Sequence, residues 1–363
     1  MGTDGGRLQA VRPAGLVVRG VPGRGHLRHR AQLRAAGRGA AEAVYLVSLL
    51  AVEGLTVTYP GGQRPAVKGV SLEIESGRTL AVVGESGSGK TTLALALAGL
   101  LDRRARRHAS RLEINGEDLL AAGRRRWRQL RRTDISFIFQ SPINSWNPTR
   151  TMIAQVRDAM SAAGRAGRMP ELMDLLARVG FEDPERRLAD LPHQLSGGML
   201  QRVSIAVAVI IEPALLIADE PTSALDSTVQ SEILAILGEL RSEADLAMLI
   251  ISHDLSVVAR VADYVMVLYG GKVVEQGARA AVLGSAVHPY TRGLLDSVPR
   301  LDGDRKILLP SMEPGHLPAS GCPFAPRCRL VVDDCRRVEP ELIPINDTLA
   351  ACPPAASSAL ITT

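Results

Sequence analysis

A glycine-rich segment at residues 84–92 constrains the fold more than any other feature of the 363-residue chain. It fits the pattern G-x-x-x-x-G-K-[ST], follows the short apolar run Thr79–Val83 and precedes a helical pattern. Glycines there let the backbone wrap around phosphate groups and point its N–H groups at the anion. We expect Lys90 to contact the β- and γ-phosphates and the Thr91 hydroxyl to ligate Mg²⁺. The candidate residues of this phosphate loop are Gly84, Glu85, Ser86, Gly87, Ser88, Gly89, Lys90, Thr91 and Thr92.

A second candidate site follows the apolar run at residues 215–218. This run reads as a buried parallel strand, so Asp219 emerges at its carboxyl end, where ligands bind in open α/β sheets. We expect Asp219 to hold the Mg²⁺ shell and Glu220 to polarise an attacking water.

Strand-like runs alternate with helical patterns from about residue 46 onward. This alternation predicts an α/β fold with a largely parallel sheet. The C-terminal residues are rich in Pro, hold all four Cys and read as a separate appendage. The strand candidates are Leu49–Thr58, Ala66–Ile74, Thr79–Val83, Ile135–Phe139, Ala214–Ala218, Ala247–Ser252 and Val265–Tyr269, with helices over 151–190 and Ser227–Leu240.

The basic charge is concentrated in two segments. Residues 1–46 hold eight Arg against Asp4 and Glu42, so the rest of the chain is nearly neutral and a nucleic-acid binder loses support. We read residues 1–46 as a disordered extension or a stretch translated from a misplaced start, with a nucleic-acid arm as the alternative. Residues 102–132 hold eleven Arg and read as a solvated surface between elements, or else as a partner-docking or lipid-headgroup face.

No apolar run reaches the roughly 18 residues expected of a membrane-spanning helix. The longest candidate, Ile205–Ile217, is broken by Glu212 and Pro213. The N-terminus lacks the sustained apolar stretch of a secretory signal. We therefore expect a soluble cytoplasmic protein.

The segment Leu195–Arg202, LSGGMLQR, resembles the signature sequence of ABC-type ATPases. It is a nest of small residues opening a helix, and the N–H groups of Ser196 and Gly198, with Gly197 between them, can bind phosphate. Leu200 departs from the Arg or Gln usual in this family, and we expect little catalytic cost because it should lie outside the phosphate contact. The resemblance covers residues 47–280 almost continuously.

The resemblance implies a P-loop NTPase (RecA-like) fold with a mainly parallel sheet and an antiparallel β subdomain. It also implies a helical signature subdomain at about 141–212 and a Cys-containing C-terminal extension at 281–363. In this family ATP lies between the phosphate loop of one subunit and the signature of another. The chain should therefore need an identical or paralogous ATPase partner to transfer phosphate to water.

Four further positions match the family's order and keep a structural alternative. Tyr59 matches the aromatic that stacks on adenine, or is a plain strand-end tyrosine. Gln140 matches the glutamine that senses Mg²⁺ and the water, or is a loop amide. Asp226, in the segment Ser223–Asp226 that crosses to the partner subunit, is also a candidate helix cap. His253 matches the switch histidine at the γ-phosphate, although a lone histidine is usually structural.

The C-terminal motifs indicate a branch of the family. HPYTR at His288–Arg292 and GCPFAPRC at Gly321–Cys328 resemble the ATP-binding subunits of oligopeptide, dipeptide and nickel importers. The resemblance implies peripheral attachment to the cytoplasmic face of the cell membrane, integral membrane permease partners and indirect dependence on a substrate-binding protein. The loop Gln140–Pro148 matches the place where the permease docks, and Trp146 is either a contact there or ordinary packing.

The four cysteines are close in sequence, with the spacing C-x5-C-x6-C-x16-C. In a cytosolic chain such a cluster favours a metal over disulfides, leaving zinc, an iron–sulfur cluster or free thiols open. Members of the importer group carry a [4Fe–4S] cluster at such a motif, so the resemblance implies a cluster with a structural role. The candidate ligands are Cys322, Cys328, Cys335 and Cys352.

The sequence therefore predicts the ATPase subunit of a peptide importer, with nickel or another small solute as the alternative cargo. An ABC ATPase acting on nucleic acid or ribosomes usually carries tandem cassettes or long coiled coils, which this chain lacks. A P-loop kinase or GTPase would give no reason for Leu195–Arg202 or His253.

Overall fold

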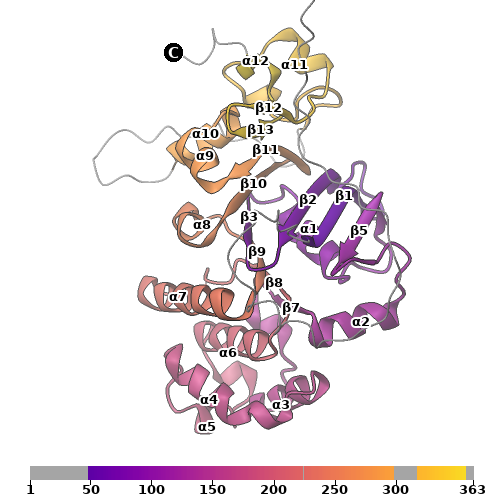
Figure 1. Cartoon of the computed structure of the whole chain (residues 1–363). Coiled ribbons are helices and arrows are strands. Elements are labelled where there is room, and N and C mark those ends of the chain that lie inside the picture. Colours follow the sequence, from indigo (N-terminus) through magenta and orange to yellow (C-terminus); the bar gives the residue numbers. More distant parts are fainter. Residues whose placement is uncertain (1–47, 224, 298–316, 357–363) are drawn as a thin grey trace, which may run out of the picture. The chain divides into compact units, whose positions relative to one another are not determined.

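A main sheet of eight strands underlies the fold in a computed structural model, which describes residues 48–223, 225–297 and 317–356 (Figure 1). Its strands follow the order β12-β13-β11-β10-β3-β9-β8-β7. From β10 to β7 the neighbours run parallel, whereas β10–β11, β11–β13 and β12–β13 pair antiparallel. The α/β fold class is thus confirmed, with a mixed sheet that is parallel from β10 to β7. The parallel strands are β3 (Thr79–Val83), β7 (Ile135–Ile138), β8 (Leu215–Asp219), β9 (Ala247–Ile251) and β10 (Tyr264–Tyr269).

Burial explains why the sequence signals of these strands are continuous apolar runs. Every residue of β3, β8 and β9 is buried, because the strands lie inside the sheet and are covered on both faces. One core cluster packs α1 (Lys90–Leu97) against one face, and a second packs α6 (Gly197–Ile210) and α7 (Ser227–Ala244) on β8 and β9. The carboxyl ends of the strands are thereby left to the loops.

A second, antiparallel sheet packs on the first core cluster. In β2 buried and exposed residues alternate, as expected for a strand with one wet face. The sheet contains β1 (Ser48–Thr58), β2 (Val67–Glu75), β4 (Arg106–His108), β5 (Arg111–Ile114) and β6 (Glu117–Asp118).

The Arg-rich segment 102–132 contains more regular structure than the sequence indicated. It includes β4, β5 and β6 and most of α2 (Arg124–Thr133), and it was expected to run between elements. Trp127 and Leu130 are the buried side of α2, while its arginines are exposed or half-buried. The exposed arginines masked a weak apolar pattern of two residues three apart.

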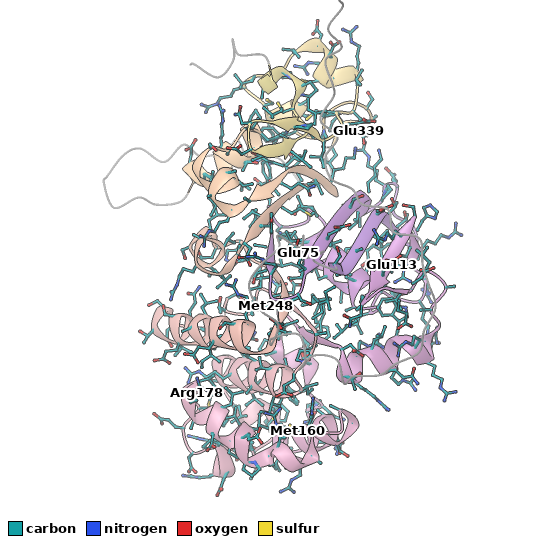
Figure 2. All side chains as sticks on the ribbon, in the orientation of Figure 1. Glu75, Glu113, Met160, Arg178, Met248 and Glu339 are labelled. Carbon is teal, nitrogen blue, oxygen red and sulfur yellow. The ribbon has the colours of Figure 1, made fainter. Side chains whose placement is uncertain are left out.

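The helical part of the chain lies between β7 and β8 in sequence, and Figure 1 shows its helices grouped together. Met160, labelled in Figure 2, is fully buried in this group. The helices are α3 (Met152–Ala162), α4 (Met169–Arg178), α5 (Pro184–Arg187) and α6. They carry the segment Leu195–Arg202 at the start of α6.

The C-terminal region, here meaning described residues 281–297 and 317–356, attaches directly to the main sheet. Its hairpin of β12 (Ile343–Ile345) and β13 (Thr348–Ala350) pairs with β11 (Lys272–Ala278). Lys68 of β2 and Lys272 both form ion pairs with Glu339, which Figure 2 labels. The remaining helices are α8 (Leu255–Val261), α9 (Arg279–Gly284), α10 (Pro289–Asp296), α11 (Asp333–Arg337) and α12 (Pro353–Ala356).

Two sequence predictions fall on parts of the chain that the structure leaves out. The extension at residues 1–46 and Ala224 of the segment Ser223–Asp226 lie outside the described residues. Within the described ranges, no helix is both long and apolar enough to cross a bilayer.

Candidate functional site

A cavity of about 540 Å³ opens where the carboxyl ends of β3, β8 and β9 meet the phosphate loop. It collects residues that the sequence predicted from distant motifs. From the phosphate loop come Gly84, Glu85, Ser86, Gly87, Gly89, Lys90, Thr91 and Thr92, and from other segments come Gln140, Glu220 and His253. The topology places these segments together because parallel strands end at the same edge of the sheet.

The glycines of the phosphate loop are required by close backbone approaches. A Cβ on Gly84 would lie 2.2 Å from the Leu268 carbonyl oxygen, and one on Gly89 would lie 2.4 Å from the Ala66 carbonyl oxygen. Gly89 also has φ +103° and caps α1, a conformation that L side chains rarely adopt. These contacts press the loop against β10 and the β1–β2 connection, so its shape is set before any ligand binds.

Lys90 is buried at the first position of α1, and the loop holds its ammonium. Its Nζ donates to the carbonyl oxygens of Gly84 and Glu85, each at 2.8 Å. Burial lowers the pKa of Lys90, while the charges of Glu220, Asp219 and Glu85 oppose that shift. The site thus presents a partly desolvated cation at the cavity wall, where its attraction for an anion is strongest.

Asp219 and Thr91 form a pair of hard oxygen donors at the end of β8. Asp219 is only 2% exposed, and burial raises its pKa, whereas a hydrogen bond from Thr91 and the charge of Lys90 lower it. A buried carboxylate beside a hydroxyl suits Mg²⁺, which prefers oxygen ligands and is usually bound through one or two carboxylates. The residues present therefore fit a magnesium ion.

Glu220, Gln140 and His253 meet at one point, and the roles that the sequence analysis assigned to each of them stay predictions. The Glu220 carboxylate accepts from Gln140 Nε2 at 3.0 Å and lies 3.1 Å from His253 Nδ1. Glu220 has a left-handed backbone with φ +49°, unusual for a residue other than glycine, and its N–H donates to the Ile251 carbonyl oxygen. Strained backbone of this kind is concentrated at functional sites. His253 has 64% of its side chain exposed.

Some predicted residues lie outside the set of described residues that line this cavity. Tyr59 is half-buried, and its hydroxyl lies 3.4 Å from Thr92 Oγ1. Asp219 and Ser88 are both buried, with 2% and 4% of their surface exposed. The signature residues and Asp226 lie on other elements.

The signature segment forms a regular helix start on the surface. Ser196 and Gly197 are exposed, and Ser196 Oγ accepts from the Met199 N–H at 3.2 Å as the N-cap of α6. Asp226 caps α7 by accepting from the N–H groups of Thr228 and Val229, and these bonds lower its pKa. Its structural reading is thus confirmed, and its role toward a partner subunit stays a prediction.

The four cysteines line a second cavity of about 590 Å³, together with His288, Asp334 and apolar side chains. Burial raises the pKa of Cys322 and Cys328, and it raises that of Cys352 to about 11. Among the described residues, however, no three His, Cys, Asp or Glu side chains are placed to hold a metal ion. The structure therefore gives the predicted iron–sulfur cluster a set of thiols around one space but no formed metal site.

Sequence reasoning missed two residues that touch the phosphate loop from the C-terminal region. Arg327 forms a two-pronged ion pair with the Glu85 carboxylate, at 2.7 and 2.8 Å. The Tyr290 hydroxyl accepts from the Glu85 N–H at 2.7 Å. Both residues belong to the motifs HPYTR and GCPFAPRC, which the sequence analysis used only to identify the branch of the family.

Comparisons with known proteins agree with this geometry. Residues 67–223 match the family model for the ABC transporter, and residues 274–335 match the model for the oligopeptide/dipeptide transporter, C-terminal region. The dipeptide transport ATP-binding protein DppD of Escherichia coli (strain K12) is 41% identical over 309 residues, which cover 83% of this chain and 94% of DppD. DppD of Bacillus subtilis (strain 168) is 44% identical over 303 residues, covering 80% and 90%.

Solved structures give the same class. The dimeric ATP-binding cassette MJ0796, in a post-hydrolysis state bound to ADP and Pi, superposes with a TM-score of 0.55 at 27% identity, covering 63% of this chain and 98% of that one. The fold and site thus define an ABC-type ATPase. The chain belongs to the ABC transporter family of ATP-binding proteins, in the branch that carries the oligopeptide/dipeptide C-terminal region.

The tight contact at Gly89 predicts a specific loss. Gly89→Ala should lower the thermal unfolding midpoint and weaken ATP binding, because the methyl group collides with the Ala66 carbonyl and the left-handed backbone costs about 1–3 kcal/mol more. The control is Gly238→Ala within α7, where a Cβ meets nothing within 4 Å and helix propensity improves by about 1 kcal/mol. Equal midpoints for the two variants would contradict this account of the loop.

Proposed function

We propose that this chain is the ATP-binding and ATP-hydrolysing subunit of an ABC importer for di- or oligopeptides. The observation that carries the proposal is the meeting of Glu220, Gln140 and His253 at the cavity that holds Lys90. The peptide cargo is supported by the C-terminal match and by the names of the relatives, which are dipeptide transport ATP-binding proteins.

In the proposed mechanism the chain supplies position and charge rather than a covalent intermediate. Lys90 binds the β- and γ-phosphates, and the N–H groups of residues 84–92 surround them. Glu220 accepts a hydrogen bond from the attacking water and aligns it with the γ-phosphorus. Gln140 and His253 contact the Glu220 carboxylate in the structure. When the nucleotide enters, they turn toward the water and the γ-phosphate.

Magnesium would be held by Thr91, Asp219 and Gln140. When bound, it neutralises charge on the phosphate oxygens. The buried Asp219 carboxylate provides the one fixed negative charge of this set, and the Thr91 hydroxyl is already directed at it.

A second ATPase subunit would complete the site. Ser196, Gly197 and Gly198 lie outside the described lining of this chain's cavity, and the first two are exposed, so they are available to another subunit. Asp226 borders the same surface, 4.0 Å from Arg202. The dimeric state of the similar cassette MJ0796 supports this arrangement. We propose that Tyr59 contacts adenine at the rim of the site.

The permease would dock at the loop Gln140–Pro148, which would place the chain at the cytoplasmic face of the membrane. Ile143 in this loop and Phe139 directly before it are among the exposed large apolar side chains of the described residues. Trp146 donates to Ser204 Oγ at 3.1 Å and packs on the helical core, so its contribution is to hold this loop. We propose that the chain consists of an ABC ATPase domain at 47–280, which contains a helical subdomain at about 141–212, and a C-terminal extension at 281–363.

Two substitutions separate binding from hydrolysis. Lys90→Ala should abolish ATP binding, because it removes the buried cation at the phosphates. Glu220→Gln should still bind ATP but slow hydrolysis by about 10²-fold or more, because the amide is a poor acceptor for the water proton. Nucleotide binding and phosphate release would be measured on the same preparations. Wild-type turnover by Glu220→Gln would show that another group polarises the water.

The cargo is tested by transport. The chain would be reconstituted with its cognate permease subunits, ATPase partner and binding protein in vesicles loaded with ATP on the ATPase side. We expect uptake of a labelled dipeptide or oligopeptide that is lost with Lys90→Ala. ATP-dependent uptake of nickel, with no uptake of peptide, would assign the chain to the alternative cargo.

We also propose that Cys322, Cys328, Cys335 and Cys352 hold a [4Fe–4S] cluster with a structural role. The support is the common cavity that the four thiols line, and the family resemblance of the motif. The sulfur atoms would have to move closer together to bind it. The cluster would therefore form only in the holoprotein, in which the four thiols lie closer together.

The cluster proposal is tested on anaerobically purified protein by assaying iron and acid-labile sulfide. We expect about four of each per chain, lost on replacing Cys328 and Cys335 with Ser. Stoichiometric zinc without iron, or no metal at all, would overturn the assignment.

A further inference from the structure

Glu85 is the second residue of the phosphate loop, and three of its groups make polar contacts: the carboxylate, the backbone N–H and the backbone carbonyl. Its carboxylate pairs with Arg327 through two parallel contacts of 2.7 and 2.8 Å, and its N–H donates to the Tyr290 hydroxyl at 2.7 Å. Its carbonyl oxygen accepts from Lys90 Nζ at 2.8 Å. A single residue therefore links the C-terminal region to the cation that binds phosphate.

Burial and contacts with aromatic rings, in addition to the ion pair with Glu85, hold the Arg327 side chain in place. Its side chain is 7% exposed, and it ends the short 3₁₀ helix Ala325–Arg327. The guanidinium lies 5.7 Å from the ring centres of both Tyr269 and Phe324, a favourable cation–π distance. A planar guanidinium held in this way is pre-organised for a bidentate carboxylate, so little conformational entropy is lost on pairing.

Tyr290 is equally constrained. Its ring is fully buried and contacts Tyr269 and Phe324, with ring centres 4.6 and 5.4 Å apart. His288 caps the start of α10 by accepting from the Tyr290 N–H at 3.1 Å. The hydroxyl is thus the polar tip of an otherwise apolar anchor, and it satisfies a backbone donor of the phosphate loop.

The ion pair between Glu85 and Arg327 affects nucleotide binding because the Glu85 carboxylate is negatively charged. Glu85 lines the cavity, so its carboxylate would repel a triphosphate if it stood alone. Pairing with Arg327 places a positive charge of the C-terminal region 2.7 and 2.8 Å from the carboxylate oxygens and so compensates the negative charge. The same pair fixes the carbonyl that positions Lys90.

We infer that Arg327 and Tyr290 are positioning residues for ATP binding, which act through Glu85 to hold Lys90 and to neutralise a repulsive charge. The C-terminal region would then determine nucleotide affinity. This inference rests on the proposed function, since it concerns the same ATP site.

The test is a double-mutant cycle on the full chain, with Mg²⁺ and a fluorescent ATP analogue as the probe. Arg327→Gln should raise the Kd about tenfold, because Glu85 is left as an unpaired charge at the phosphates. In the Glu85→Gln background the same change should raise the Kd less than about threefold. In the reconstituted transporter, KM for ATP should rise with Arg327→Gln while kcat changes little. The control, Arg337→Gln, removes a 70% exposed arginine of the same region and should leave the Kd unchanged.

A second, more conservative variant tests the same contact and separates its loss from misfolding. Tyr290→Phe keeps the buried ring and removes only the acceptor for the Glu85 N–H, so the Kd should rise a few-fold with an unchanged thermal midpoint. The inference is overturned if Arg327→Gln and Tyr290→Phe both bind within twofold of wild type. It is also overturned if the loss with Arg327→Gln is as large in the Glu85→Gln background. A wild-type chain that does not bind the probe would instead reject the proposed function.

Discussion

The buried ammonium of Lys90 is the interaction on which the rest of the site depends. A cation at this depth must have acceptors and nearby negative charge, because desolvation alone disfavours it. The carbonyls of Gly84 and Glu85 supply the acceptors, and Asp219 and Glu220 supply charge from the end of β8. The loop can present those carbonyls only because Gly84 and Gly89 admit the backbone of β10 and residue 66 at contact distance.

The same constraint explains why the site draws on so many segments. The acidic residues that balance Lys90 are also those that would hold magnesium and the attacking water. In the proposed mechanism, the same side chains therefore neutralise the cation and prepare the reaction. The C-terminal region also contributes a charge to this site, because Arg327 neutralises Glu85 beside the cavity. Ser196 and Gly197 of the signature segment are exposed at the start of α6 and lie outside the described lining of the cavity, as expected for a site completed by another subunit.

The parallel strands were predictable because complete burial produces unbroken apolar runs, as in β3 and β8. The strands β4 to β6 and the hairpin β12–β13 were not, because each has four residues or fewer and takes its stability from a neighbouring strand. The meeting of Glu220, Gln140 and His253 could be anticipated from the edge of the sheet where their strands end. The pairing of Arg327 with Glu85 joins residues 242 positions apart through a region with no periodic signal, so only the structure reveals it.

The most direct test of this account is an experimental structure of the assembled transporter carrying Glu220→Gln, determined with ATP and Mg²⁺. The account predicts ATP enclosed between two ATPase subunits, with the γ-phosphate in contact with Lys90 of one and the facing subunit's signature segment. ATP bound away from residues 84–92, or held there while both signature segments face solvent, would contradict it.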